Sequence, residues 1–156
     1  MRKFQAERKR LSSEVHLRSA AEKVFPLLCP MREYDWIDGW ICELVASESG
    51  FAEENCIFKC DLPIWGKETW YILNFETGRG WTAIRTGEHI STRIDLSLNE
   101  ENGSTIFRAE FLLTATDPEG NVQIGNFPDE FAYQFCSRLG RMLDYYIENG
   151  KAMPLE

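Results

Sequence analysis

The sequence predicts one α+β domain in which a curved antiparallel β-sheet of about seven strands wraps around a long C-terminal helix, with two short helices after the first strand. Three observations predict it. Apolar and polar residues alternate over residues 11–18, strand-like segments separated by turn residues fill residues 40–116, and residues 128–149 carry an apolar stripe at helical spacing. A chain of 156 residues has the length of one domain with a sizeable core. The long helix is the amphipathic element available to cover the inner face of such a sheet.

The first strand and the two short helices are expected near the N-terminus. The alternation over residues 11–18 has the period of a half-buried strand. Ser19, with Glu22 three residues later, fits a capping box and predicts a short helix over residues 20–28. A proline ends this helix, and a second short helix is expected over residues 31–38, where a glycine follows.

Six further strands are expected before the last helix, each separated from the next by turn residues such as Gly, Pro and Asn. Because the turns are short, consecutive strands should pair antiparallel. The Asn-Gly pair after the fifth of these strands favours a tight hairpin. The segment 68–77 is apolar on both faces, so the sequence leaves open which of its faces points inward. The six expected strands span residues 40–49, 55–62, 68–77, 80–87, 90–99 and 104–116.

The long helix is expected from about Pro128 to Asn149. Proline suits the first turn of a helix, and Gly150 suits the position just after its end. Asp129 and Glu130 stand where the helix dipole favours anions. The apolar stripe recurs every three or four residues and consists of Phe131, Phe135, Leu139, Met142, Leu143 and Tyr146.

The formal net charge of −8 is unevenly distributed along the chain. Residues 1–10 hold five basic side chains and one acidic one; without them the totals of 17 basic and 25 acidic residues fall to 12 and 24. We therefore expect a basic N-terminal arm (1–10), one domain (11–151) and a short tail (152–156). A solvated arm is the simpler interpretation, and contact with an anionic membrane is the alternative. Because the acidic body would repel phosphate backbones, nucleic acid is not an expected partner.

The remaining sequence features favour a cytoplasmic protein without a metal or cofactor. No apolar run approaches the roughly 20 residues that span a bilayer, and the N-terminus lacks the apolar core of a signal peptide. The five cysteines are odd in number and scattered, which does not fit a disulfide framework. Cys56 and Cys60 would lie about 13 Å apart on one face of a strand, so buried free thiols are expected rather than a metal site. Phosphate-loop, dinucleotide, zinc and calcium fingerprints are absent.

The order of the elements resembles the helix-grip fold of the START-like, or SRPBCC, superfamily, which includes the birch-pollen-allergen family, lipid-transfer domains and polyketide cyclases. Three segments carry the resemblance over roughly residues 11–151. They are Val15-His-Leu-Arg-Ser-Ala-Ala-Glu-Lys-Val-Phe25, the aromatic Tyr34-Asp-Trp-Ile-Asp-Gly-Trp40, and the end of the long helix at Tyr145-Tyr-Ile-Glu-Asn-Gly-Lys151. A proline that is common in relatives near Ala20 is absent. This fold hosts transport, cyclisation and protein interaction, so the resemblance does not specify a function.

The resemblance implies a cavity between the concave face of the sheet and the last helix, holding a small hydrophobic molecule of lipid, aromatic or polyketide type. Tryptophan suits the wall or rim of such a cavity, because it has a broad apolar body and one N–H donor. Trp65, which lies in a turn, is expected to cap an edge or mark an exposed patch. The alternative for each candidate is that it fills the core. The expected ligand-binding residues are Trp36, Trp40, Trp70, Ile94, Phe111, Leu113, Phe131 and Phe135.

Whether the chain is an enzyme stays open at this stage. His89 is the best candidate for a general base, since an imidazole titrates near neutrality, with Glu68, Arg85 and Glu43 as partners if they point inward. A surface histidine is the simpler interpretation of His89. The main hypothesis is a binding or carrier domain for a small hydrophobic ligand. The alternatives are a cyclase or dehydratase acting on such a ligand, and a module whose acidic surface binds a protein partner.

Overall fold

The computed structural model describes residues 3–155 and contains a seven-stranded antiparallel sheet with strand order β1-β7-β6-β5-β4-β3-β2. The expected fold class is confirmed. The strands are β1 (Arg8–Leu17), β2 (Cys42–Ala46), β3 (Ile57–Leu62), β4 (Gly66–Glu76), β5 (Gly80–Thr86), β6 (Ile90–Glu101) and β7 (Ser104–Ala115). The helices are α1 (Ala21–Val24), the 3₁₀ helix η1 (Phe25–Leu28), α2 (Pro30–Trp36), α3 (Pro118–Gly125) and α4 (Phe131–Asn149).

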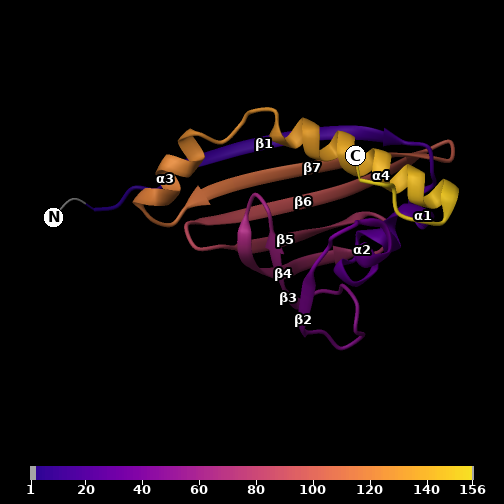
Figure 1. Cartoon of the computed structure of the whole chain (residues 1–156), viewed down its shortest axis with the longest axis horizontal. Helices are drawn as coiled ribbons and strands as arrows, with labels where there is room; N and C mark the ends of the chain where they lie inside the picture. The colour runs from indigo at the N-terminus through magenta and orange to yellow at the C-terminus, as the bar shows by residue number, and fades with distance from the viewer. Residues whose placement is uncertain (1–2, 156) are drawn as a thin grey trace.

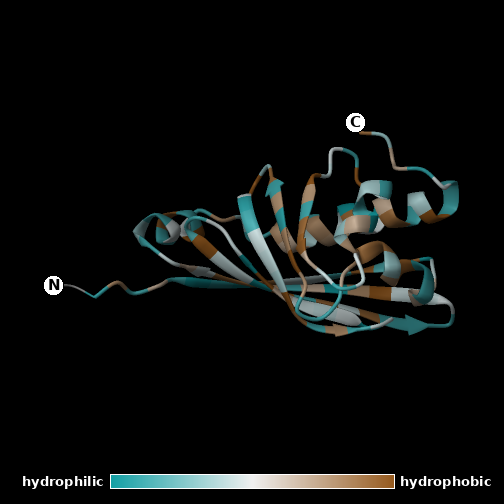
Figure 2. Cartoon of the chain, turned by 90° about the horizontal axis from the view of Figure 1, so that it is seen from below, coloured by the Kyte–Doolittle hydropathy of each residue, from teal (hydrophilic) through white to brown (hydrophobic). Residues whose placement is uncertain are grey.

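The helices lie on one side of the sheet. Figure 1 shows α4 running along the edge of the sheet that β1 and β7 form. The helix α2 lies over the strands near the opposite edge (Figure 1). Figure 2, seen from below, shows the sheet curving up around these helices, with hydrophobic segments facing them. Gly140 lets α4 approach β1 closely, since an added Cβ would lie 3.1 Å from both methyl carbons of Val15. Within residues 3–155, no helix is long and apolar enough to cross a membrane.

The N-terminal strand begins at Arg8, three residues earlier than expected, so the predicted boundary of the basic arm is wrong. Residues 8–10 pair with residues 112–114 of β7. The Lys9 ammonium group donates a 2.7 Å hydrogen bond to the carbonyl oxygen of Phe127 and also forms an ion pair with Asp129. Charge alone suggested a solvated arm, but backbone pairing with β7 and these side-chain contacts hold the segment on the sheet.

The first predicted helix is split, and its predicted cap is wrong. Pro26 lies in the middle of the segment and lacks the N–H that an α-helical bond would need, and the segment continues as the 3₁₀ helix η1. The N-cap residue of α1 is Ala20, whose side chain makes no capping bond. Instead the carboxylate of Glu100, at the end of β6, accepts a 2.8 Å bond from the Ala21 N–H. Because the cap comes from a distant strand, local sequence could not reveal it.

Near the C-terminus the sequence missed α3 and began α4 too early. Asp117 caps α3, accepting a 2.8 Å bond from the Gly120 N–H, and Pro118 occupies the first turn. This Asp-Pro start was a readable signal that the interpretation overlooked. The helix α4 begins at Phe131 rather than at Pro128. Its predicted end is confirmed, because Gly150 closes it in the left-handed conformation with φ 71°.

A β-bulge settles which residues of β4 face inward. Trp70 and Ile72 are buried on the inner face, while Tyr71 and Leu73 are exposed on the outer face. The pairing with β5 shifts register between Ile72 and Asn74. After this shift Phe75 points inward and packs against Phe25 with ring centroids 5.2 Å apart. A single bulge therefore lets an apparently two-faced apolar segment serve one core.

Candidate functional site

A cavity of about 110 Å³ lies between the inner face of strands β3 to β7 and the helices α2 and α4. Aromatic rings from several elements dominate its wall, and two charged side chains interrupt it. The lining residues are Leu28, Pro30, Glu33, Ile37, Trp40, Phe58, Leu62, Trp65, Trp70, Ile72, Trp81, Arg85, Ile94, Leu96, Phe111, Phe135 and Leu139. Concave, mostly apolar sites with a few polar groups are the usual form of small-molecule sites.

Arg85 is the central charged residue of this wall. It stands on β5 directly opposite Trp70 of β4 and Thr92 of β6, so its side chain shares their buried inner face. Only 3% of Arg85 is exposed. Its guanidinium carbon lies 3.6 Å from the centre of the Trp65 ring and 5.4 Å from that of Trp70. The aromatic faces partly compensate the cation for the loss of water through cation–π attraction.

Glu68 is the charged partner of Arg85 but is too distant for a strong hydrogen bond. Its Oε1 lies 3.6 Å from Nη1 of Arg85, and both side chains are almost fully buried. Burial raises the pKa of Glu68 to about 7, and Arg85 opposes that rise. Burial likewise lowers the pKa of Arg85 to about 10, which leaves the guanidinium protonated at neutral pH. The pair therefore carries net positive charge whenever Glu68 holds its proton.

Several buried polar atoms at this place lack hydrogen-bond partners among residues 3–155. Three are donors on cavity-lining residues: Nε and Nη2 of Arg85, and Nε1 of Trp70. Glu68 Oε1 and Thr92 Oγ1 are likewise unpartnered. Buried polar groups in folded proteins are nearly always hydrogen-bonded, so each exception calls for an explanation. Among these unpartnered atoms, hydrogen-bond donors outnumber acceptors.

Trp65 forms the wall between the cavity and the solvent. It lies in the turn between β3 and β4 and is partly exposed. Its ring stacks on Phe127, in the connection between α3 and α4, with centroids 5.1 Å apart, and meets Phe131 edge-on at 5.2 Å. The contacts of Trp65 with Phe127 and Phe131 therefore hold this turn against the start of α4.

Glu33, from α2, is the acidic residue among those that line the cavity. Desolvation in the aromatic cavity wall raises the pKa of Glu33 to about 8. The residue keeps partial contact with solvent. At neutral pH a protonated Glu33 would be a hydrogen-bond donor, and its ionised form an acceptor.

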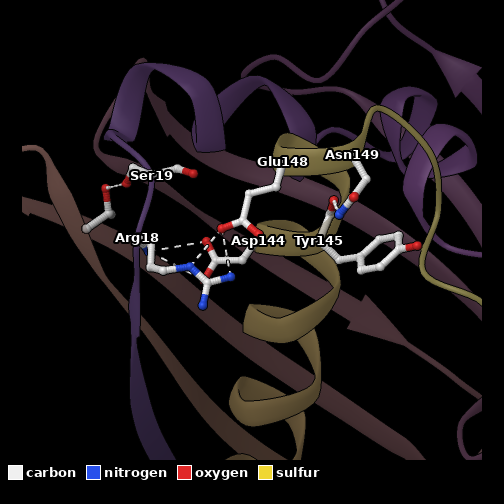
Figure 3. Close-up of polar contacts among 7 residues, drawn as sticks. Arg18, Ser19, Asp144, Tyr145, Glu148 and Asn149 are labelled. Carbon is white, nitrogen blue, oxygen red and sulfur yellow. Dashed lines mark hydrogen bonds and ion pairs between the residues drawn. The ribbon is translucent and has the colours of Figure 1, made fainter.

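Polar contacts at the far end of α4 fix the helix against the sheet. Figure 3 shows Arg18, at the end of β1, reaching Asp144 and Glu148 of α4. The buried Asp144 carboxyl accepts the Arg18 backbone N–H, at 3.2 Å through Oδ1, and Arg18 Nε donates to Glu148 Oε1 at 2.7 Å. Burial raises the pKa of Asp144, while the bond from the Arg18 backbone opposes the rise. These contacts hold the helix that closes the cavity.

Five of the eight predicted ligand-binding residues line the cavity, and three do not. The five are Trp40, Trp70, Ile94, Phe111 and Phe135. Trp36 is fully buried and donates a 2.8 Å bond to the Leu27 carbonyl, so it fills the core beneath the short helices. Leu113 is fully buried outside the lining set, and Phe131 packs between Trp65 and Phe111. Placement in the wall does not test binding, which stays a prediction for the five.

His89 lies away from the cavity, at the turn between β5 and β6. Its Nδ1 is 2.6 Å from Oδ2 of Asp117, the residue that caps α3. This bond is the main cause that raises the pKa of His89. Of the proposed catalytic partners, Glu68 and Arg85 do point inward, but neither contacts His89 among the described residues, and Glu43 is exposed. A catalytic role of His89 in the cavity is therefore not favoured by its position.

The sequence analysis named Arg85 only as a possible partner of His89 and did not single out Glu33. It expected Trp65 to cap an edge or mark an exposed patch rather than to line the cavity. One signal was available for Arg85, because alternation within Trp81-Thr-Ala-Ile-Arg85 puts the arginine on the same face as Trp81 and Ala83. For Glu33 and Trp65, position depends on how a short helix and a turn dock onto the sheet. Within residues 3–155, no group of three or more His, Cys, Asp and Glu side chains is arranged to hold a metal ion.

Comparison with known proteins identifies the fold through structure rather than through sequence. No family model and no curated protein matches the chain. Norcoclaurine synthase from Thalictrum flavum superposes with a TM-score of 0.69 at 10% identity, over 96% of this chain and 99% of that one. Another structure of that protein, in complex with dopamine and hydroxybenzaldehyde, gives a TM-score of 0.69 at 8% identity, over 95% and 91%.

Two further solved structures give the same fold. DynU16, a protein of the dynemicin biosynthetic locus, matches with a TM-score of 0.63 at 14% identity over 91% of this chain, which spans only 48% of DynU16. Ara h 8.0201 matches with a TM-score of 0.63 at 12% identity, over 91% of this chain and 99% of that one. At such low identities the likeness concerns the fold. With its seven-stranded antiparallel sheet closed around α4, the chain has the helix-grip fold that norcoclaurine synthase and Ara h 8.0201 also have.

Proposed function

We propose that this protein binds a small, single-ring organic molecule that carries an acceptor oxygen, such as a carboxylate, phenolate or carbonyl group. The ring lies among the aromatic side chains of the cavity, and the oxygen accepts hydrogen bonds from Arg85 and Trp70. The observation that carries the proposal is the set of buried, unpartnered donors on these two residues.

The energetics favour a polar ligand over a purely apolar one. A buried donor without an acceptor costs about 1–3 kcal/mol, and more when it is charged. A ligand oxygen placed between Arg85 Nε, Arg85 Nη2 and Trp70 Nε1 removes part of that cost, whereas a hydrocarbon leaves it in place. Because the guanidinium is stacked on Trp65, its fork is already oriented for binding.

The size of the cavity argues for a single ring. Drug-sized ligands occupy sites of roughly 300–1,000 Å³, while an engineered apolar cavity of about 150 Å³ accepts benzene. At about 110 Å³ this cavity is smaller than either, so one ring is the most that it can enclose. The structural neighbour norcoclaurine synthase, which is known in complex with dopamine and hydroxybenzaldehyde, shows that the same fold accepts single-ring molecules in a different protein.

The proposal is tested with three probes that share a ring and differ in their polar group. Benzoate, toluene and benzylammonium are titrated into the protein by calorimetry, with fluorescence from the cavity tryptophans as a second readout. We expect benzoate to bind at least tenfold more tightly than toluene. Benzylammonium should bind least, because its positive charge is repelled by the positive charge of Arg85. Equal affinity for benzoate and toluene would contradict the role given to the oxygen.

Variants distinguish binding of the ligand's ring from binding of its polar oxygen. Arg85→Met should weaken benzoate binding by tenfold or more and leave toluene binding nearly unchanged. The matched control is Arg93→Gln, because Arg93 lies on β6 with a side chain 53% exposed and an ion pair to Asp95. If none of the probes binds the wild-type protein, and organic extraction of the purified protein yields no small molecule, the binding function itself is wrong.

An enzymatic function is the second candidate, and the observation that favours it is Glu33 rather than His89. A carboxyl that lines the cavity and has a pKa raised to about 8 has the properties of a general acid or base. A proton-transfer step of the cyclase or dehydratase type would place Glu33 beside the ligand that Arg85 orients. In that case Glu33→Gln should retain binding and abolish turnover. Loss of both together would favour a purely structural role.

A further inference from the structure

Two cysteines occupy directly opposite positions on neighbouring strands at the edge of the sheet. Cys42 of β2 is paired with Cys60 of β3, and both side chains point to the same face. Cys60 is almost fully buried, while Cys42 is only partly so. Both line an open groove of about 490 Å³ at this edge, so a small reagent in solvent can reach them.

The hydrogen bonds of Cys42 show which kind of cross-strand pair this is. Its backbone N–H donates to the Tyr34 hydroxyl at 2.7 Å, and its carbonyl oxygen accepts from the same hydroxyl at 2.7 Å. In a strand, the N–H and C=O of one residue point to the same side. The two groups of Cys42 therefore point away from β3, toward Tyr34 on α2.

It follows that Cys42 and Cys60 form a non-hydrogen-bonded antiparallel pair. In such pairs the Cα atoms lie about 4.5 Å apart and the side chains come closer than at the alternate positions. A disulfide requires a Cα–Cα separation of roughly 4.4–6.8 Å. The strand register thus gives the two Cα atoms a separation at which a disulfide can form without a shift of register.

We propose that Cys42 and Cys60 form a redox-active dithiol that a small hydroperoxide converts into a cross-strand disulfide and that a thiol reductant restores. In the first step the Cys42 thiolate attacks the peroxide, its sulfur is oxidised to a sulfenic acid, and hydroxide or alkoxide leaves. In the second step the Cys60 sulfur attacks the sulfenic sulfur, the S–S bond forms, and water leaves. Overall two electrons and two protons pass from the thiols to the peroxide.

The roles of the two cysteines follow from their environments. Cys42 is the more accessible of the two, so the peroxide reaches its sulfur first. Cys60 is almost fully buried, and burial raises its pKa, so it acts second, as the resolving thiol. Nearby Glu33 and Glu68 add to that rise. Neither cysteine lines the aromatic cavity; both line the separate groove, together with Glu68.

The other three cysteines provide internal comparisons. Cys136 is buried on α4, with its thiol donating to the Ser13 carbonyl, and burial raises its pKa to about 11. Cys29 accepts the Ala52 N–H, and Cys56 is buried with a raised pKa. None of these three occupies a strand position opposite another cysteine.

The test treats the purified full chain with hydrogen peroxide and maps the products by peptide mass spectrometry without reduction. We expect a Cys42–Cys60 crosslink within the monomer, loss of two of the five free thiols, and full recovery with dithiothreitol. The oxidised protein should also unfold at higher urea, because the bond closes a loop between two strands. A disulfide between other cysteines, or one formed only between chains, would overturn the proposal.

Two variants keep the test decisive even if one of them folds poorly. Cys60→Ser removes the resolving thiol and should leave a sulfenic acid on Cys42 that dimedone traps. Cys42→Ser should abolish both the crosslink and the dimedone adduct. Cys136→Ser is the control and should leave crosslinking unchanged. Over-oxidation of Cys42 to sulfinic acid in the wild-type protein, without a crosslink, would show that Cys60 does not resolve it and would refute the dithiol.

Discussion

The guanidinium of Arg85 lies 3.6 Å from the centre of the Trp65 ring, so a residue of the sheet and a residue of a surface turn form one wall of the cavity. The arginine is buried with unpartnered donors, and the tryptophan separates it from solvent. Trp65 therefore both covers the cavity and orients the guanidinium of Arg85.

Trp65→Ala should open the cavity and loosen Arg85. We expect dissociation of benzoate to accelerate at least tenfold, because the ring both covers the ligand and orients the guanidinium. The free energy of unfolding should fall by about 1–3 kcal/mol, less than for a fully buried tryptophan since Trp65 is partly exposed. Stopped-flow fluorescence and urea unfolding measure the two effects. Trp65→Phe, which retains a ring, is the control, and an unchanged dissociation rate in Trp65→Ala would exclude the covering role.

Glu68 should make the protein less stable as pH rises from about 4.5 to about 7. The folded carboxyl keeps its proton to about pH 7, whereas its ordinary value is 4.5. The folded state therefore binds more protons in this window, and stability declines as pH rises through it. Glu68→Gln should flatten the decline by about 1–3 kcal/mol. The measurement is urea unfolding at several pH values, and parallel curves for the two proteins would contradict the raised pKa.

The same ionisation should control ligand affinity. Below about pH 7 a protonated Glu68 leaves the charge of Arg85 to the ligand, and above it the carboxylate competes for the guanidinium. Benzoate affinity should therefore fall as pH rises through 7 in the wild-type protein. In Glu68→Gln it should be higher at pH 8 than in the wild-type protein, and the smaller pH dependence that remains should be that of Glu33, whose pKa is raised to about 8. Calorimetric titration at pH 6 and pH 8 checks this, and a matching pH dependence in the variant would assign the effect to another group.

Gly140→Val should separate α4 from β1. Even a Cβ at this position lies 3.1 Å from the Val15 methyl carbons and 3.2 Å from Leu17, so two further methyl groups cannot be accommodated. We expect a loss of about 1–3 kcal/mol in the free energy of unfolding. Gly125→Ala in α3 is the matched control, because nothing lies within 4 Å of an added Cβ there. Thermal unfolding compares them, and equal stability of the two variants would mean that α4 adjusts freely.

His89 and Asp117 should contribute a pH-dependent bond to the start of α3. The bond to Asp117 raises the pKa of His89, so its stabilisation is present below the ordinary histidine value of 6.5 and is lost as pH rises through the folded-state pKa. His89→Ala should therefore destabilise the protein at pH 5.5 and have little effect at pH 9. His16→Ala on β1 is the control. Thermal unfolding at both pH values gives the comparison, and an effect that is the same at both would indicate packing rather than charge.

Local pattern was sufficient for most elements of the fold. Alternation located the strands, and the stripe from Phe131 to Tyr146 located α4, because burial of one face imposes a period that survives in the sequence. Local pattern failed where a distant residue decides the structure. The cap of α1 comes from Glu100, and Lys9 is held by Phe127 and Asp129. The missed helix α3 was different, since its Asp117-Pro118 start was present in the sequence and overlooked.

The candidate site was predictable only in part. Periodicity could place Phe111 and Phe135 on inward-facing positions, and the resemblance implied a cavity there; both residues line the cavity. Trp36 has the same aromatic character but fills the core, because apolar side chains look alike in sequence whether they surround a cavity or pack solidly.

Residue spacing within short segments was enough to predict the antiparallel sheet, the long closing helix and the segregation of apolar residues to one face. Folding was needed to show that Arg85 is buried beside Trp65 and Glu68, that Glu33 faces the same cavity, and that Cys42 lies opposite Cys60. Desolvation and charge pairing depend on separations between residues far apart in the chain, and strand register and helix docking set these separations.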